Sequence, residues 1–189
     1  MKGAIIVLSG LLLATPVVAQ TAQQKAGGAV QSLSASSASF VKQVAISDLF
    51  ETASARLALA RGSDAQKQFA NQMLQDHGKT SADLRRIMIE RSFSVDLPSQ
   101  LDRKHQAMLD QLNGTDGEQF VATYASQQVQ AHQDAVALFE GYANNGDLPQ
   151  LKQWAAQTLP VLQHHLEMAQ KLGPSQAGAP TVGTAPAAK

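Results

Sequence analysis

Cysteine is absent from this chain of 189 residues, and aromatic residues make up only 5% of it. Without cysteine there is neither a disulfide framework nor a thiolate metal site, so stability must come from the packed core. No apolar run reaches the ~20 residues that a membrane-spanning helix needs. Basic and acidic residues number 15 each. This balance gives no electrostatic footprint for nucleic acid or anionic lipid, and we expect neither as a partner.

The N-terminal segment has the pattern of a cleavable secretory leader. A single cation, Lys2, precedes an apolar and small run from Gly3 to Ala14, and Val17-Val18-Ala19 supplies a small-x-small exit site. We therefore expect a signal peptide over residues 1–19. The mature chain would begin at Gln20 and would be periplasmic or secreted.

Two segments flank a central region of ordinary domain size. Residues 20–38 are mainly Gln, Ala, Ser and Gly, which bury too little apolar surface to offset the entropy of ordering. Residues 173–189 carry Pro174, Pro180 and Pro186 among small residues. The sequence thus predicts a disordered linker over 20–38, one domain over 39–172 and a disordered tail over 173–189.

The central region has the apolar period of helices almost throughout, and strand-like alternation is absent. Ser63 followed by Gln66 predicts a capping box at the start of the second helix. The first three expected helices run over about 39–61, 63–91 and 99–112. A fourth follows the turn at residues 113–117 and ends at Asn144-Asn145-Gly146, and the last runs over about 148–172. This pattern predicts an all-α fold, a four-helix bundle in which the third, short helix is a crossover.

Four polar residues interrupt the apolar stripes, one in each long helix: Glu51, His77, His132 and His165. Bundles build metal and cofactor sites from inward-facing residues of this kind. If the short helix carries the chain back to the end where it turned at Gly62, as in ferritin-like bundles, the four residues lie about 15–22 Å from that end. They would then share one layer, although a simple up-down bundle would align them almost equally well.

A carboxylate-bridged di-iron site needs a glutamate three residues before its histidines. Leu74, Val129 and Leu162 stand at those places instead. One carboxylate and three imidazoles remain as candidate ligands. Asp76 and His164 flank them, and for these two we favour exposure to solvent, or a contact with a ligand from outside the site, over binding the metal itself. Such a set suits Zn, Cu, Ni or mononuclear Fe better than a bridged pair. The alternative is a hydrogen-bonded polar layer that fixes helix register and holds no metal.

No arrangement for covalent or hydrolytic catalysis emerges. The chain has no Gly-x-Ser-x-Gly elbow, no phosphate-binding glycine loop and no paired carboxylates on one helix. Two function classes survive. One is an envelope protein that binds a transition metal ion or uses it in redox chemistry. The other is a non-enzymatic structural or stress-related envelope protein that binds another envelope protein or the cell wall. Enzymatic activity and oligomeric state stay open.

Several sequence blocks together resemble one bacterial family. They are Phe40-Val41, Glu51, Phe69-Ala70, Asp76-His77, Phe120 to Tyr124, His132, Thr158-Leu159-Pro160 and His164-His165-Leu166-Glu167-Met168-Ala169. At these spacings the chain resembles the domain-of-unknown-function 4142 family, a secreted group classed with ferritin-like proteins. The resemblance implies a ferritin-like bundle but no activity, because the family has no established general one. Its members usually carry Asp where this chain has Val121, so a ligand at that place would be lost here.

Overall fold

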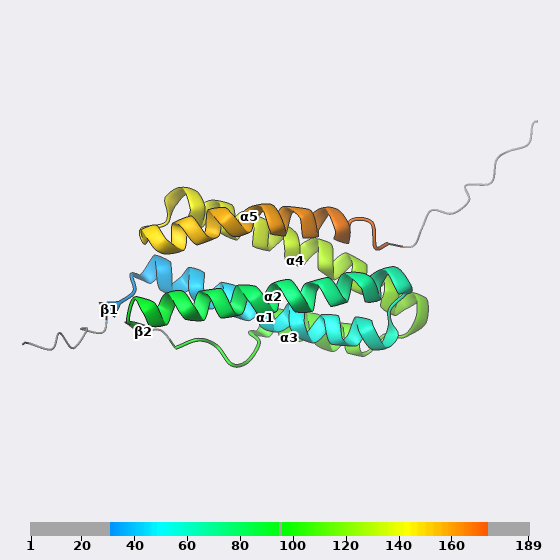
Figure 1. Cartoon of the computed structure of the whole chain (residues 1–189). Helices are drawn as coiled ribbons and strands as arrows, with labels where there is room; N and C mark the ends of the chain where they lie inside the picture. The colour runs from blue at the N-terminus through cyan, green and yellow to red at the C-terminus, as the bar shows by residue number, and fades with distance from the viewer. Residues whose placement is uncertain (1–30, 95, 174–189) are drawn as a thin grey trace, which may run out of the picture.

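The computed structural model describes residues 31–94 and 96–173, so the expected leader, most of the expected linker and nearly all of the expected tail lie outside the described residues. Within the described part, helices account for nearly all regular structure, as expected (Figure 1). The helices are α1 (Ala35–Arg61), α2 (Asp64–Glu90), α3 (Arg103–Asn113), α4 (Gly117–Asn145) and α5 (Pro149–Ala169).

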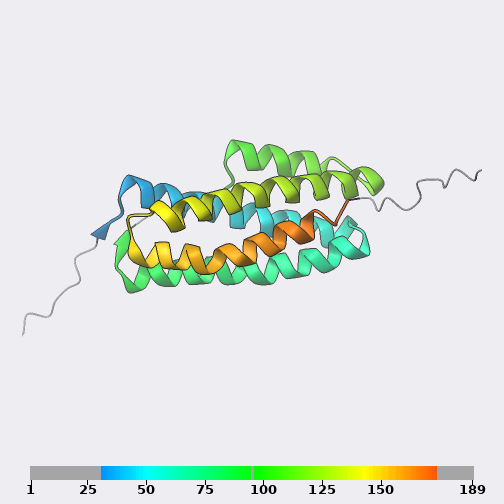
Figure 2. The same cartoon turned by 90° about the horizontal axis from the view of Figure 1, so that it is seen from above.

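The four long helices pack as two antiparallel hairpins. α1 packs on α2, and α4 packs on α5, while contacts of α1 with α4 and of α2 with α5 join the hairpins. Between the hairpins the chain returns along the bundle through α3, which lies against α1 and α4 (Figures 1 and 2). α4 therefore starts at the end where α1 turned into α2. This is the topology for which the positions of the four polar residues along the bundle axis were calculated from the sequence.

Side-chain caps set the observed helix boundaries. Ser34 accepts a hydrogen bond from the backbone N–H of Ser37 at 3.0 Å, so α1 begins one turn before the expected start at Ser39. The predicted capping box of Ser63 and Gln66 is confirmed at the start of α2. α3 begins later than expected, because Asp102 is its cap and accepts from the backbone N–H of His105 at 2.8 Å.

A short strand pair was not expected from the sequence. β1 (Gln31–Ser32) lies parallel to β2 (Phe93–Ser94), so the chain that enters α1 is bonded to the chain that leaves α2. Two residues per strand are too few to give a periodic signal, which explains why alternation did not reveal them. The pairing fixes this end of the first hairpin.

A polar layer divides the apolar core in two. One cluster includes Phe40, Phe139 and Trp154, at the end where β1 and β2 lie. The other includes Phe69 and Phe120, at the end where α1 turns into α2. Between them, at mid-height of the long helices, lie the buried polar residues Asp48, Glu51, His77, Gln128, His132 and His165. The core thus places a candidate site in the centre of the bundle.

None of the described helices combines the length and the apolar character needed to cross a membrane. Their buried faces are apolar, but their outer faces carry polar and charged side chains. This agrees with the absence of a long apolar run in the sequence.

Candidate metal centre

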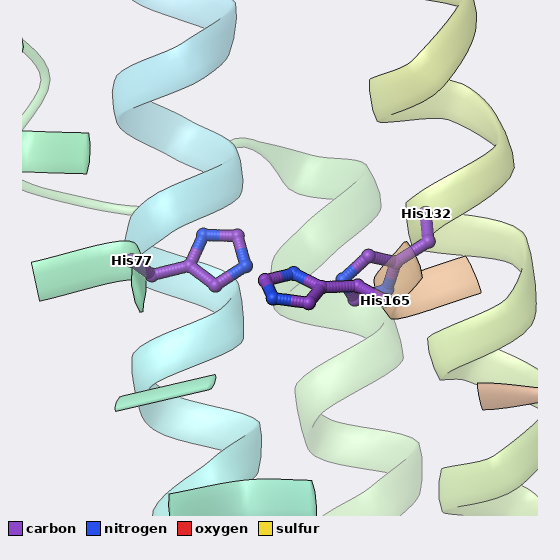
Figure 3. Close-up of side chains that lie close together, drawn as sticks. All are labelled: His77, His132 and His165. Atoms are coloured by element: carbon purple, nitrogen blue, oxygen red, sulfur yellow. The ribbon is translucent and has the colours of Figure 1, made fainter. Parts of the chain in front are cut away.

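Three imidazoles from three different helices meet in the polar layer. His77 comes from α2, His132 from α4 and His165 from α5, and all three residues are at most 3% exposed. One ring nitrogen of each lies within 4.8 Å of those of the other two. The ring centroids are 5.4, 5.8 and 5.9 Å apart, so the rings form a nearly equilateral triangle. Figure 3 shows the three rings turned toward one another from their helices.

Each imidazole is held by a hydrogen bond from one of its two nitrogens. The Nδ1–H of His77 donates to Oδ1 of Asp48 on α1 at 2.8 Å. The Nδ1–H of His132 donates to the backbone carbonyl of Gln128, one turn earlier on α4, at 2.9 Å. The Nε2–H of His165 donates to Oδ2 of Asp76 on α2 at 2.8 Å. These bonds fix the orientation and the tautomer of all three rings.

Among the described residues, the remaining ring nitrogens have no hydrogen-bond partner. They are Nε2 of His77, Nε2 of His132 and Nδ1 of His165, and all are buried. In each neutral tautomer this second nitrogen carries a lone pair. Histidine ligands of metal ions characteristically donate their other N–H to a carboxylate or a backbone carbonyl. The three histidines therefore have the bonding pattern of metal ligands before any ion is considered.

Burial keeps two of the three rings neutral at pH 7. Desolvation, together with repulsion from a protonated His77, lowers the pKa of His132 to about 4. Desolvation likewise lowers the pKa of His165 to about 4, although the hydrogen bond to Asp76 opposes the shift. Neutral imidazole is the form that binds metal.

His77 behaves differently from the other two rings. Desolvation disfavours its charged form, but the hydrogen bond and the charge of Asp48 outweigh that effect, and the pKa of His77 is raised above 6.5. The imidazole and the carboxylate are both almost fully buried, at 4% and 7% side-chain exposure. Below this raised pKa, a metal ion that binds Nε2 of His77 must therefore displace a proton.

Glu51 lies in the same layer but outside the imidazole triangle. Glu51 is 1% exposed, and its Oε2 has no hydrogen-bond partner in the described part of the chain. Its oxygens do not belong to the group of ligand atoms that lie within 4.8 Å of one another. Desolvation raises the pKa of Glu51 to about 7, although His77 and a hydrogen bond from Gln128 lower it. Glu51 is thus a neighbour of the three histidines rather than a member of the triangle.

Asp48 was missed by the sequence analysis. It stands three residues before Glu51 on α1, so the conclusions that the layer has one carboxylate and that no helix carries paired carboxylates were wrong. Asp48 reaches the layer through its bond to His77, and Ser81 donates to its second oxygen at 2.6 Å. The i, i+3 spacing to Glu51 was the signal that could have revealed it, because residues three apart share a helix face.

The two flanking residues have different places. Asp76 is bonded to His165 and so has the outer role that the sequence favoured. His164 faces solvent, with its side chain 66% exposed and Nδ1 3.9 Å from Glu167. Val121 stands eleven residues before His132 on α4, about 16 Å along the axis. Its backbone carbonyl accepts from Gln66 at 2.7 Å, so position 121 could not supply a ligand to this triangle.

Comparison with known proteins identifies the family. The family model of the domain of unknown function DUF4142 matches residues 20–172, and the chain belongs to that family. No curated protein and no solved structure matches the chain. The family resemblance of the sequence is therefore confirmed, and the matched region includes the whole candidate metal centre.

Proposed function

We propose that this DUF4142 protein binds a single transition metal ion through Nε2 of His77, Nε2 of His132 and Nδ1 of His165. The observation that carries the proposal is the convergence of three buried, unpartnered imidazole nitrogens whose rings are each fixed from behind. Tetrahedral ligands at about 2.0–2.1 Å from a metal lie about 3.4 Å from one another. Nitrogens within 4.8 Å of one another need only small ring movements to reach that spacing.

The donor set favours particular ions. Three imidazoles suit Zn, Cu, Ni or mononuclear Fe, and they leave a coordination position open. Glu51 is a further candidate, beside Asp48 and Asp76, to balance the charge of the ion, because its buried carboxylate interacts with His77 and, among the described residues, has an oxygen without a partner. The proposal assigns metal binding and no reaction.

The fold supports a ferritin-like classification of this centre. Two antiparallel hairpins joined by a crossover are the topology of ferritin-like proteins, which hold their metals in the middle of the bundle. Here, however, the histidines lack the glutamates of a di-iron site, so we propose a mononuclear variant. We further propose that the protein acts outside the cytoplasm after cleavage of residues 1–19.

The competing function is a metal-free polar layer in a structural envelope protein. Buried polar atoms in such a layer would be expected to bond to one another. Instead, among the described residues, one nitrogen of each imidazole in the triangle has no hydrogen-bond partner, and one oxygen of Glu51 also has none. Leaving a buried polar atom unpaired costs about 1–3 kcal/mol, and a bound cation would satisfy several of these atoms at once.

The decisive experiment is elemental analysis of tag-free protein purified from the periplasm. We expect about one transition metal ion per chain, and loss of that ion in His132→Ala. His164→Ala is the matched control, because this neighbouring histidine faces solvent. Addition of the identified ion to metal-free wild type should raise the melting temperature, because a ligand that binds only the folded state stabilises it. A melting temperature of the wild-type protein that does not change with Zn, Cu, Ni, Mn or Fe would refute metal binding. The polar layer would then have a structural role.

A further inference from the structure

A small cavity of about 180 Å³ lies at the surface between α2 and α5, which run side by side (Figure 2). Residues at helical spacing line it from both helices: Asp76, Thr80 and Asp83 on α2, and Trp154, Thr158 and Val161 on α5. The cavity is smaller than the pockets of about 300–1,000 Å³ that bind organic ligands. It has room for a few water molecules or for a hydrated metal ion.

Asp76 connects this cavity to the histidine triangle. It lines the cavity with 29% of its side chain exposed, and its Oδ2 accepts a hydrogen bond from Nε2 of His165 at 2.8 Å. Nδ1, on the other side of the same ring, is the buried nitrogen of His165 that the proposed metal site uses. A single imidazole ring therefore separates the cavity from the triangle.

Asp76 is also the carboxylate of the cavity that is available to a cation. Both hydrogen bonds to its side chain are accepted by Oδ2, so within the described ranges Oδ1 accepts none. Asp83, in contrast, is paired with Lys79 at 2.5 Å and with Arg86 at 3.3 Å. A hydrated cation that enters the cavity thus meets a negative charge next to His165.

The α5 wall of the cavity has a gap in its backbone hydrogen bonds. Pro160 lies inside α5 and has no N–H, so the carbonyl of Ala156 loses its bond within the helix. Helices bend at such places. α2 and α5 also pack more loosely than the two helices within either hairpin. Movement of α5 at this point would let the ring of His165 turn aside.

The groups that hold the other two imidazoles are less accessible. Asp48 holds His77 and lines a cavity between α1 and α2. Its side chain, however, is only 7% exposed, and both of its oxygens already accept hydrogen bonds. Gln128, whose carbonyl holds His132, is fully buried. Of the three residues that hold the imidazoles, Asp76 is therefore the one that is open to solvent.

We propose that a divalent transition metal ion enters the triangle through this cavity, passing from the carboxylate of Asp76 to the three imidazoles as the ring of His165 turns aside. The route rests on the proposed metal binding and adds to it the place of entry. Val161, which is 43% exposed, lies at the surface of the cavity. A substitution there changes access without replacing a histidine or a core residue.

The test compares the rates of Zn²⁺ uptake and release by stopped-flow mixing, with a chromophoric zinc chelator as the reporter. Val161→Trp narrows the cavity and should slow both rates severalfold by the same factor. The Kd should stay unchanged, because the bound and free states are the same. Thr52→Trp narrows the cavity between α1 and α2 instead. It is the matched control and should leave both rates unchanged.

A charge at the same position gives a second measurement that adds little bulk. Val161→Lys should slow uptake about tenfold at low ionic strength, because its ammonium group repels the incoming cation, and salt should reduce the effect. Gln163→Lys adds the same charge at an exposed position of α5 outside the cavity and should have little effect. Melting temperatures of the metal-free variants show that each is folded.

Three results would overturn the route. They are uptake by Val161→Trp and Val161→Lys at the wild-type rate, equal slowing by Thr52→Trp, and a Kd that weakens in Val161→Trp while uptake keeps its rate. In each case the wild-type protein still binds Zn²⁺, so the metal proposal stands. Wild-type protein that takes up no Zn²⁺ would overturn the route as well, and the elemental analysis would then decide separately whether another metal is bound.

Discussion

Asp48 on α1 and His77 on α2 form a buried pair, with Oδ1 of the carboxylate 2.8 Å from Nδ1 of the imidazole. The pair joins the two helices of the first hairpin at mid-height. It also directs Nε2 of His77 toward His132 and His165, because the ring can turn only one nitrogen toward the carboxylate. The orientation of one candidate ligand thus depends on a residue from another helix.

Asp48→Asn should weaken metal binding about 10- to 100-fold, the usual effect of removing a partner that orients a metal-bound histidine. The amide keeps the size of the side chain but loses the negative charge that favours the Nδ1–H tautomer. Competition with a chelator of known affinity measures the change. Asp64→Asn, at an exposed position, serves as control, and equal affinities of Asp48→Asn and wild type would contradict the role of Asp48.

Glu51→Gln should stabilise the metal-free protein at pH 8 by about 1–3 kcal/mol. Burial raises the pKa of Glu51 from 4.5 to about 7, so a charged carboxylate opposes folding above pH 7. Gln has the same shape without that charge. At pH 5 the folded-state carboxyl is protonated, and the substitution should change the free energy of unfolding little. Urea denaturation at both pH values tests the difference, and equal effects at the two would count against the raised pKa.

The metal-free protein should be most stable near pH 6.5. Below that value the unfolded chain protonates two histidines, His132 and His165, whose pKa in the fold is about 4. Glu51 has the opposite effect on stability, because its carboxyl stays protonated in the folded state up to about pH 7. About one extra proton on the unfolded chain between pH 4.5 and 5.5 means that stability falls there by about 1 kcal/mol per pH unit on acidification.

Above pH 6.5 the slope should reverse. The pKa of His77 is raised in the folded state. Its contribution to the free energy of unfolding is therefore complete below pH 6.5 and is lost as the pH rises through the folded-state pKa. Glu51 acts in the same direction up to about pH 7. Urea denaturation with a chelator present, at half-unit pH steps, gives the profile. His132→Gln should flatten the acid side, whereas His164→Gln should leave it unchanged. A profile that rises steadily from pH 5 to 8 would be incompatible with these shifts.

Two buried tyrosines should respond in opposite ways to removal of the hydroxyl. Tyr142 OH contacts Ser37 Oγ and lies 3.4 Å from Asp147, so Tyr142→Phe should cost about 1 kcal/mol. Tyr124 OH is buried and has no hydrogen-bond partner among residues 31–94 and 96–173, so Tyr124→Phe should be neutral or stabilising. Thermal or urea denaturation of both variants decides. A larger loss for Tyr124→Phe would show that its hydroxyl has a partner in solution.

The chain should be exported and cleaved before Gln20, as the exit site Val17-Val18-Ala19 predicts. N-terminal sequencing of the periplasmic or secreted protein tests this. Ala19→Arg should accumulate as an unprocessed precursor, because the exit site needs a small residue there. Val18→Leu alters the tolerant middle position and should be processed normally. A cytoplasmic protein that keeps Met1 would end the export proposal.

The helices and the histidines of the polar layer could be read from the sequence alone. The apolar period of each segment depends on local spacing, and an imidazole on an apolar stripe must enter the core of any bundle that buries the stripe. Ser63 and Gln66 likewise determine a helix start from four consecutive residues. The family resemblance had the same basis, since its blocks are local patterns.

Only the tertiary structure decided which polar residues meet. Asp48 is hydrogen-bonded to a histidine 29 positions away in the sequence, and Asp76 to one 89 positions away. Over such sequence separations a single sequence carries no signal of which residues pair. The structure also placed Glu51 beside the triangle rather than within it. Helical spacing fixes the height and the face of a side chain, but the rotation and approach of neighbouring helices decide whether two atoms come within bonding distance. For that physical reason the sequence determined the polar layer, whereas the packing of α1, α2, α4 and α5 determined the triangle.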